Sequence, residues 1–155
     1  MKVSKPIRVL FVCTGNSARS QMAEAVLQGI GGVDFEVYSA GTEPQGINPF
    51  TVRVLADAGF DLSGARSKST DEFVGQSFDY VITVCDRARA VCPVFPGHGE
   101  RLHWGLEDPA EVEGSVDQKL AAFRRTYAEV NQHIRPFVEV ALKAAGRRRS
   151  STIAG

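Results

Sequence analysis

The chain has 155 residues, 43% of them hydrophobic and 23% charged, which is the size and composition of one ordinary globular domain. Its 18 basic and 18 acidic residues cancel, so we expect no nucleic-acid partner, because such binders need a positive field. No apolar run reaches the roughly 20 residues of a membrane span. Three cysteines, an odd number, and the lack of a signal-peptide pattern favour free thiols in the cytoplasm.

Strand-like and helix-like segments alternate along the chain. Strands are expected at residues 7–12, 35–39, 80–84 and 102–104. Helices are expected at residues 18–30, 49–59, 69–72 and 115–145, and Pro136 predicts a kink or break in the last. The alternation predicts an α/β fold, a three-layer doubly wound four-stranded parallel sheet in the order 2-1-3-4. We expect a single domain over residues 1–145 and a disordered basic tail over residues 146–155.

Two cysteines are expected at one crevice of this sheet. Ligands of doubly wound folds bind outside the carboxyl ends of the strands, where the strand order reverses. In the order 2-1-3-4 that point lies between the first and third strands. Cys13 directly follows the first strand and Cys85 directly follows the third. The topology therefore predicts that both thiols lie at the same edge.

The loop after the first strand has the composition of an oxyanion cradle. Its residues are Cys13, Thr14, Gly15, Asn16, Ser17, Ala18, Arg19 and Ser20. Backbone N–H groups of such a turn converge on an oxyanion at a helix N-terminus, and Gly15 and Asn16 tolerate the positive φ that it needs. Arg19 can bind two oxygens, and the Ser20 hydroxyl can donate to a thiolate at Cys13. A buried cysteine in an ordinary turn is the alternative, which the spacing of the arginine disfavours.

Three further residues carry weaker signals. Asp108 precedes Pro109, a pair that on its own indicates a loop turn. Cys85 and Cys92 are core thiols, half a metal site or a redox pair; their spacing is unlike that of zinc ligands, so we expect no metal. On a helix the two would lie about 10.5 Å apart, beyond the Cα separation of about 7 Å that a disulfide spans. A redox pair would therefore have to unwind the segment between them.

The motifs taken together resemble one protein family. They are Cys13-Thr14-Gly15-Asn16-Ser17 with Arg19-Ser20, Ser39-Ala40-Gly41-Thr42, Asn48-Pro49, Cys85 with Cys92-Pro93, and His103-Trp104-Gly105 with Asp108-Pro109-Ala110. The chain resembles the low-molecular-weight protein tyrosine phosphatases over residues 7–137, and more closely their thioredoxin-coupled arsenate reductase branch. The phosphatases carry tyrosines where this chain has Ala110, Glu111 and Val112. That difference favours a small inorganic anion as the substrate.

The resemblance implies a mechanism for arsenic detoxification. Cys13 attacks arsenate held by the loop and Arg19, and Asp108 is the general acid. Cys85 and then Cys92 resolve the intermediate, and thioredoxin, or alternatively glutaredoxin with glutathione, reduces the final disulfide. Phosphate and sulfate are expected as competing anions, and a monomer is expected.

The resemblance also implies a cation site with one substitution. Some members of the branch bind potassium through side chains that match Asn16, Glu24 and Ser39, together with an aspartate. Lys68 takes the place of that aspartate. We therefore expect that the ammonium replaces the ion, that potassium is not required and that no other cofactor is needed. A solvated surface lysine is the alternative.

Two other functions remain open at this point. One is a phosphatase acting on phosphotyrosine or a small phosphate ester, since the loop and the acid suffice for it. The other is a redox sensor whose cysteines report oxidation without turnover. His98, His103 and His133 have no partner at catalytic or ligand spacing, so we assign them surface or core roles.

Overall fold

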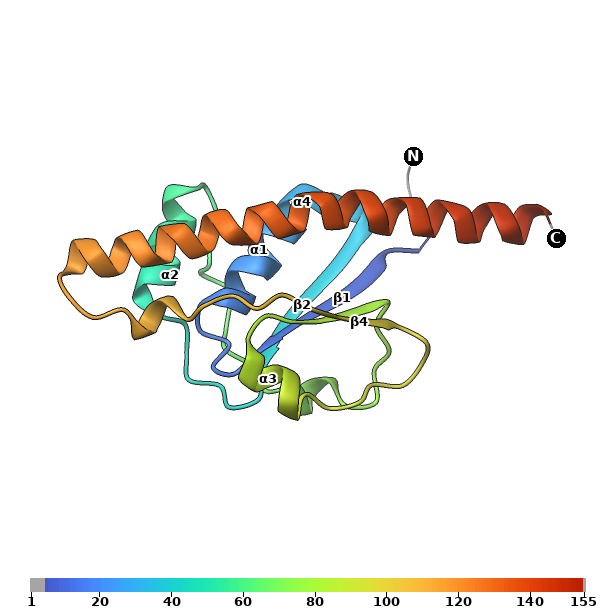
Figure 1. Ribbon diagram of the computed structural model, residues 1–155. Coiled ribbons are helices and arrows are strands. Elements are labelled where there is room, and N and C mark those ends of the chain that lie inside the picture. The colour runs from blue at the N-terminus through green and yellow to red at the C-terminus, as the bar shows by residue number, and fades with distance from the viewer. Residues whose placement is uncertain (1–4, 155) are drawn as a thin grey trace.

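The computed structural model describes the backbone of residues 5–154 and the side chains of residues 5–146. Its centre is one parallel sheet (Figure 1). The strands are β1 (Ile7–Cys13), β2 (Phe35–Gly41), β3 (Tyr80–Thr83) and β4 (Glu100–His103), in the order β2-β1-β3-β4. This confirms the predicted doubly wound parallel sheet in the order 2-1-3-4.

Side chains of each strand alternate between two covered faces. On β2, Val37 and Ser39 face the side of the helices α1 (Arg19–Gly31) and α4 (Val116–Ala154), and the Ser39 hydroxyl donates to Glu24 of α1. Tyr38 points the other way, where its ring meets those of Phe73 and Phe78 at 5.5 and 6.0 Å. The first of these belongs to the short helix η2 (Thr70–Phe73). Both faces of the sheet are thus buried, as expected for parallel strands.

Helix starts follow the capping signals in the sequence. The Asn48 side chain accepts a hydrogen bond from the N–H of Phe50 at 2.9 Å and starts α2 (Pro49–Asp57). Ser115 and Gln118 bond each other reciprocally at the start of α4, at 2.8 and 3.1 Å. Three shorter helices complete the chain: η1 (Gly32–Asp34), α3 (Asp86–Val91) and η3 (Pro109–Glu111).

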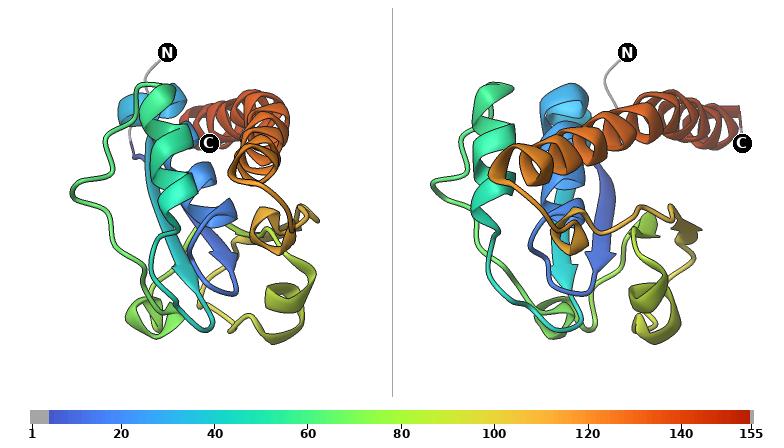
Figure 2. Two further views of the ribbon diagram at one scale, coloured as in Figure 1. Left: turned by 90° about the vertical axis from the view of Figure 1, so that its left-hand side faces the viewer. Right: turned by 60° about the vertical axis from the view of Figure 1, so that its left-hand side comes forward.

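Helix α4 differs from its prediction in two respects. It is not broken at Pro136 but continues through it. Pro136 and Gln132 are exposed, so the carbonyl that loses its N–H partner faces water. The helix also runs to Ala154, beyond the expected end at residue 145. Arginine is a good helix former and an established helix propagates at little cost, so the lone Gly146 does not stop it. Figure 2 shows α4 running alongside α1 and α2.

The stripe of α4 that faces the body is buried at Phe123, Val130 and Ile134. Between this helix and the sheet lies Trp104, the single tryptophan of the chain. Its ring stacks on that of His133 at 4.9 Å and meets Phe11 of β1 at 5.7 Å. Trp104 is therefore a packing residue.

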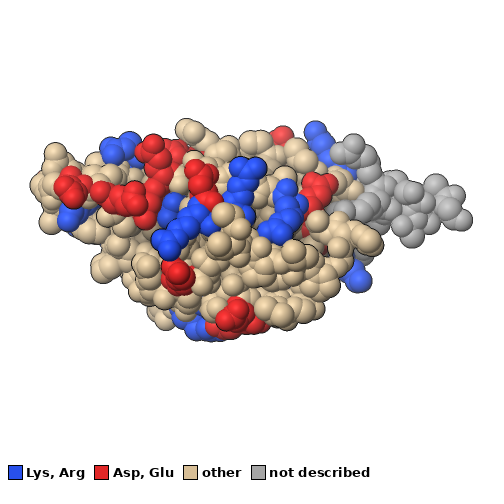
Figure 3. Space-filling view, turned by 60° about the horizontal axis from the view of Figure 1, so that its bottom comes forward, with Lys and Arg blue, Asp and Glu red and all other residues tan. Residues whose placement is uncertain are grey.

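Acidic and basic side chains lie next to each other over the face drawn in Figure 3, with no large area of one sign. Among the helices that the structure describes, none combines the length and the apolar character needed to cross a bilayer. On the face drawn in Figure 3, a small anion therefore meets no broad field of one sign.

Candidate active site

Cys13 ends β1 and lies under the loop that leads into α1. The thiol is buried, with 2% of the residue exposed. The backbone N–H of Asn16 donates to its Sγ at 3.1 Å, and the Ser20 hydroxyl lies 2.8 Å from the same sulfur. The predicted loop thus surrounds this sulfur with polar groups.

Asn16 organises the loop from within. It is fully buried and has a φ of 48°, the one positive φ of a non-glycine residue in the described chain. Its amide group donates to Ser20 at 2.8 Å and to Ser39 at 3.0 Å, and its carbonyl oxygen accepts from the N–H of Lys68 at 2.8 Å. Gly15 and Asn16 were both expected to tolerate a positive φ, and it is Asn16 that adopts it.

Gly41 is a site residue that sequence reasoning missed as such. A side chain at this position would place its Cβ 2.5 Å from the carbonyl oxygen of Thr14 and 2.9 Å from the N–H nitrogen of Asn16. Only glycine lets β2 approach the loop so closely. The signal that could have found it is a glycine at the carboxyl end of a strand that neighbours the cysteine loop.

A cavity of about 470 Å³ opens over the loop. Its walls include the loop residues 13–15 and 17–19 together with Cys85, Asp86, Asp108 and Ala110. Arg19 is anchored by a hydrogen bond to the carbonyl of Leu106 at 3.1 Å, and its guanidinium lies 3.5 Å from the Asp108 carboxylate. Asp108 itself accepts from the N–H of Ala110 at 3.0 Å. The cavity therefore combines a nucleophile, a fixed cation and an acid.

Cys85 lies across the cavity from Cys13. It is buried at the N-terminal end of α3, and its sulfur is 3.4 Å from the Thr14 hydroxyl. All three cysteines are free thiols. The topology therefore brings the first two cysteines to one cavity, at the predicted edge of the sheet.

Cys92 lies at the opposite end of α3 and does not line the cavity. Burial raises the pKa of the Cys92 thiol, while the charge of Arg101 and its hydrogen bond to the sulfur oppose that rise. The segment between Cys85 and Cys92 is helical, so the condition under which the sequence predicted unwinding is met.

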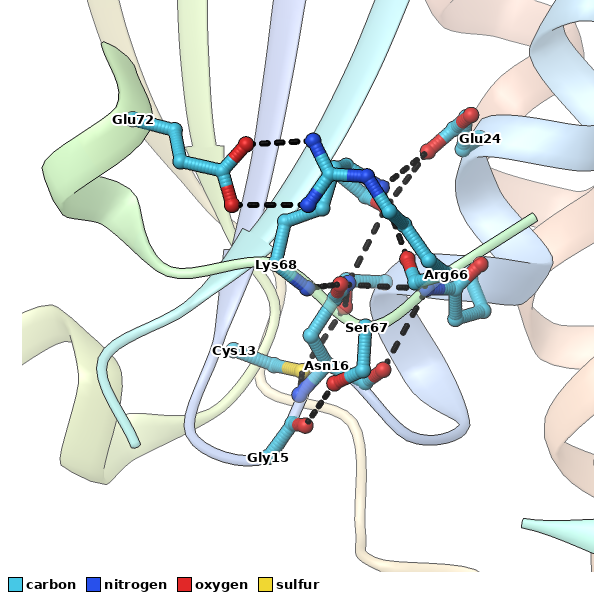
Figure 4. A network of polar contacts seen from close by, with 11 residues as sticks. Cys13, Gly15, Asn16, Glu24, Arg66, Ser67, Lys68 and Glu72 are labelled. Atoms are coloured by element: carbon cyan, nitrogen blue, oxygen red, sulfur yellow. Dashed lines mark hydrogen bonds and ion pairs between the residues drawn. The ribbon is translucent and has the colours of Figure 1, made fainter. Parts of the chain in front are cut away.

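Lys68 lies beneath the loop among the residues of the expected cation site. Its ammonium is 3.8 Å from the Glu24 carboxylate and donates to the carbonyl of Arg66 at 3.0 Å. Figure 4 shows Asn16 between the Cys13 sulfur and the backbone of this segment. The Lys68 side chain is only 13% exposed, which disfavours the alternative of a solvated surface lysine.

Further catalytic or metal-binding groups would come from the histidine and acidic side chains. His103, which was assigned a surface or core role, contacts both Thr83 and Asp86. Over the part of the chain that the structure describes, no three His, Cys, Asp or Glu side chains gather as a group able to hold a metal ion.

Comparisons with known proteins agree with this geometry. Residues 8–148 match the model of the low molecular weight phosphotyrosine protein phosphatase family. An arsenate reductase from Halalkalibacterium halodurans is 44% identical over 131 residues, which are 84% of this chain and 94% of that relative. A solved arsenate reductase in the phosphate binding state has a TM-score of 0.68 at 28% identity, covering 86% of this chain and 97% of that one. A thioredoxin-dependent arsenate reductase from Corynebacterium glutamicum has a TM-score of 0.59 at 34% identity, covering 85% and 64%.

Proposed function

Because the chain belongs to the low-molecular-weight phosphotyrosine protein phosphatase family, we propose that it is an arsenate reductase that works by a three-cysteine relay. The observation that carries this proposal is the cavity that holds Cys13, Arg19, Asp108 and Cys85 together. A phosphatase needs the first three of these groups but has no use for a second thiol.

In the first step the Cys13 thiolate attacks the arsenic atom of arsenate. The loop N–H groups and Arg19 hold the oxyanion, and Asp108 gives its proton to the departing oxygen, which leaves as water. A covalent sulfur–arsenic(V) adduct results. The location of Arg19 and Asp108, 3.5 Å apart in the wall of the same cavity, supports these roles. Ala110 and Glu111 in the cavity wall leave it without an aromatic side chain for an aryl ester.

In the second step the Cys85 thiolate attacks the sulfur of Cys13. A Cys13–Cys85 disulfide forms, the sulfur–arsenic bond breaks, and its electron pair leaves with arsenic as arsenite. The Thr14 hydroxyl, 3.4 Å from the Cys85 sulfur, can donate to that thiolate. β1 and β3 are neighbours in the sheet with Val12 opposite Thr83, so Cys13 and Cys85 follow adjacent strand ends and line the same cavity.

In the third step the Cys92 thiolate attacks Cys85. A Cys85–Cys92 disulfide forms, the Cys13–Cys85 bond breaks, and the Cys13 thiolate is free for another arsenate. An external dithiol then returns two electrons and two protons to the pair. We propose thioredoxin as that donor, since a relative of this chain is described as thioredoxin-dependent. A cytoplasmic location supplies such reduced dithiols.

The test is a coupled assay. The wild-type chain should oxidise NADPH on addition of arsenate when thioredoxin and thioredoxin reductase are present, and phosphate or sulfate should compete. Cys92→Ser should release one equivalent of arsenite per chain and then stop. Asp108→Asn should slow even that first release, by about 10²-fold or more, because it removes the acid.

Other outcomes would contradict the relay. Multiple turnovers by Cys92→Ser would exclude the third step, and oxidation of the cysteines without arsenite release would favour a redox sensor. Coupling to glutaredoxin and glutathione instead of thioredoxin would change only the donor.

We keep phosphatase activity as a second candidate, because the family description and the loop with its acid both favour it. Hydrolysis of an aryl phosphate requires Cys13, Arg19 and Asp108 but neither of the other cysteines. A chain with both Cys85 and Cys92 replaced by serine should therefore keep any phosphatase activity and lose arsenate turnover.

We also propose that Lys68 replaces a potassium ion. The ammonium lies near Glu24, and that carboxylate accepts from Ser39. One fixed positive charge thus stands among residues that match a cation site. Turnover is then expected without potassium or any other cofactor.

A further inference from the structure

The imidazole of His103 bridges two elements beside Cys85. Its Nε2 lies 2.7 Å from an Asp86 carboxylate oxygen, and its Nδ1 lies 2.8 Å from the Thr83 hydroxyl. Asp86 is the first residue of α3, the helix that separates the two resolving cysteines. The contact therefore ties the end of β4 to the start of this helix.

The histidine side of this contact is fixed. Thr83 and His103 are partners in the register of β3 and β4, and the His103 side chain is only 18% exposed. The Thr83 hydroxyl also lies within bonding distance of the Leu102 carbonyl, at 3.4 Å. The Asp86 side chain is 90% exposed. The imidazole of His103 is therefore held in place by the sheet, and the exposed carboxylate of Asp86 on α3 contacts it.

Helix α3 has little else to hold it. It has six residues, and Ala88 is its single buried one. Its N-terminal cap is Cys85, whose side chain makes no capping hydrogen bond. The other ion pair of this helix, from Arg87 to Glu43, is exposed at both ends. A helix this short is unstable on its own, so its contacts with the body determine whether it forms.

We propose that the His103–Asp86 contact is a latch that keeps α3 helical in the dithiol form. The latch makes His103 and Asp86 positioning residues that set how readily Cys85 and Cys92 form their disulfide. This inference rests on the proposed function insofar as these two cysteines are the redox pair.

The direction of the effect follows from the geometry. Disulfide formation removes two electrons and two protons from the two thiols and requires α3 to unwind. A latch that stabilises the helix stabilises the dithiol, so loss of the latch favours the disulfide. A side-chain contact with one exposed partner is worth on the order of 1 kcal/mol or less. We therefore expect a shift of about fivefold in the equilibrium constant, which is about 20 mV.

The experiment isolates this one equilibrium. The full chain carrying Cys13→Ser is equilibrated with mixtures of reduced and oxidised dithiothreitol, and alkylation followed by mass measurement gives the disulfide fraction. No arsenate is present. Asp86→Ala and His103→Gln should each raise the disulfide constant about fivefold. The double variant should raise it no further, because each change alone opens the latch.

Two further variants sharpen the result. Asp86→Asn keeps an acceptor for the imidazole N–H, so its disulfide constant should lie between those of wild type and Asp86→Ala. Arg89→Ala removes an exposed charge from the same helix outside the latch and should leave the constant unchanged. Should His103→Gln fail to fold, the exposed Asp86 position still tests the latch.

The outcomes separate two failures. Additive effects in the double variant, or equal constants in all variants, would overturn the latch. If Cys85 and Cys92 form no disulfide at any ratio of dithiothreitol, both the relay and the latch are wrong. If the disulfide constants of the variants shift as expected but no arsenate turnover is seen in the coupled assay, the latch is supported and arsenate is not the substrate.

Discussion

At the scale of single residues, one asparagine links the nucleophile to its surroundings. Asn16 adopts a left-handed backbone conformation and satisfies its buried amide with Ser20, Ser39 and Lys68. A buried polar group with every partner in place holds one geometry, since each broken bond costs free energy. The loop is therefore shaped before any anion arrives.

Lys68 gives the first prediction at this scale. Lys68→Ala removes the positive charge beside Glu24, so the proposed reductase should lose about fivefold in turnover, equivalent to about 1 kcal/mol. Potassium should restore the variant and leave wild type unchanged, and sodium at equal ionic strength is the control. Marked stimulation of wild type by potassium would show that the ammonium does not replace the ion.

Arg101 gives a second prediction. Its guanidinium lowers the pKa of Cys92 against the effect of burial, so Arg101→Ala should raise that pKa further. Less thiolate then forms at neutral pH, and alkylation of Cys92 by iodoacetamide should slow by roughly threefold, as expected for a partly exposed pair. At a pH above the pKa of Cys92 in both wild type and Arg101→Ala, the two alkylation rates should converge. A rate difference that persists at high pH would mean that Arg101 acts by shielding the thiol.

The sequence predicted which residues form the loop, but not which of them adopts the positive φ. Either Gly15 or Asn16 could supply the positive φ, and only the contacts of Asn16 with distant segments decide between them. The His103–Asp86 contact was equally hidden, because it depends on the register of β4 beside β3. The two residues of each such contact lie far apart in the chain, so the sequence shows no spacing pattern that would predict the contact.

At the scale of elements, α3 is the helix that the proposed relay requires to unwind. Oxidation of Cys85 and Cys92 should strip protection from the backbone N–H groups of residues 86–91, because the disulfide cannot span the helix. Hydrogen exchange measured by mass spectrometry on the dithiol and disulfide forms of the Cys13→Ser chain would show this. Exchange in α2 should stay the same in both forms. Retained protection in α3 would exclude unwinding.

Element type was easier to predict than element length. Capping residues marked the starts of α2 and α4 correctly. The expected helix ended at residue 145, whereas α4 runs to Ala154, because a basic, glycine-containing segment looks disordered by composition although arginine continues a helix well. The helix is also not broken at Pro136, since the cost of a proline depends on whether the freed carbonyl meets water, which a sequence alone does not reveal.

At the scale of the molecule, α4 closes one face of the sheet. Phe123 is 1% exposed and its ring meets Phe50 of α2 at 5.3 Å. Phe123→Ala should lower the free energy of unfolding by about 3–5 kcal/mol, through lost burial and the cavity left behind. Urea denaturation measures this, with Val140→Ala, exposed on the same helix, as the control that should change little. Equal effects of the two changes would mean that α4 is not part of the core.

The fluorescence of Trp104 can report on changes in the fold of the whole molecule. The ring touches β1 through Phe11 and α4 through His133 and Phe137, so one indole reports on the two layers at once. Because the chain has no other tryptophan, emission excited at the indole band comes from this point alone. The fluorophore also directly follows His103 in the chain. Movement at the end of β4 should therefore change the colour and intensity of its emission, without any attached dye.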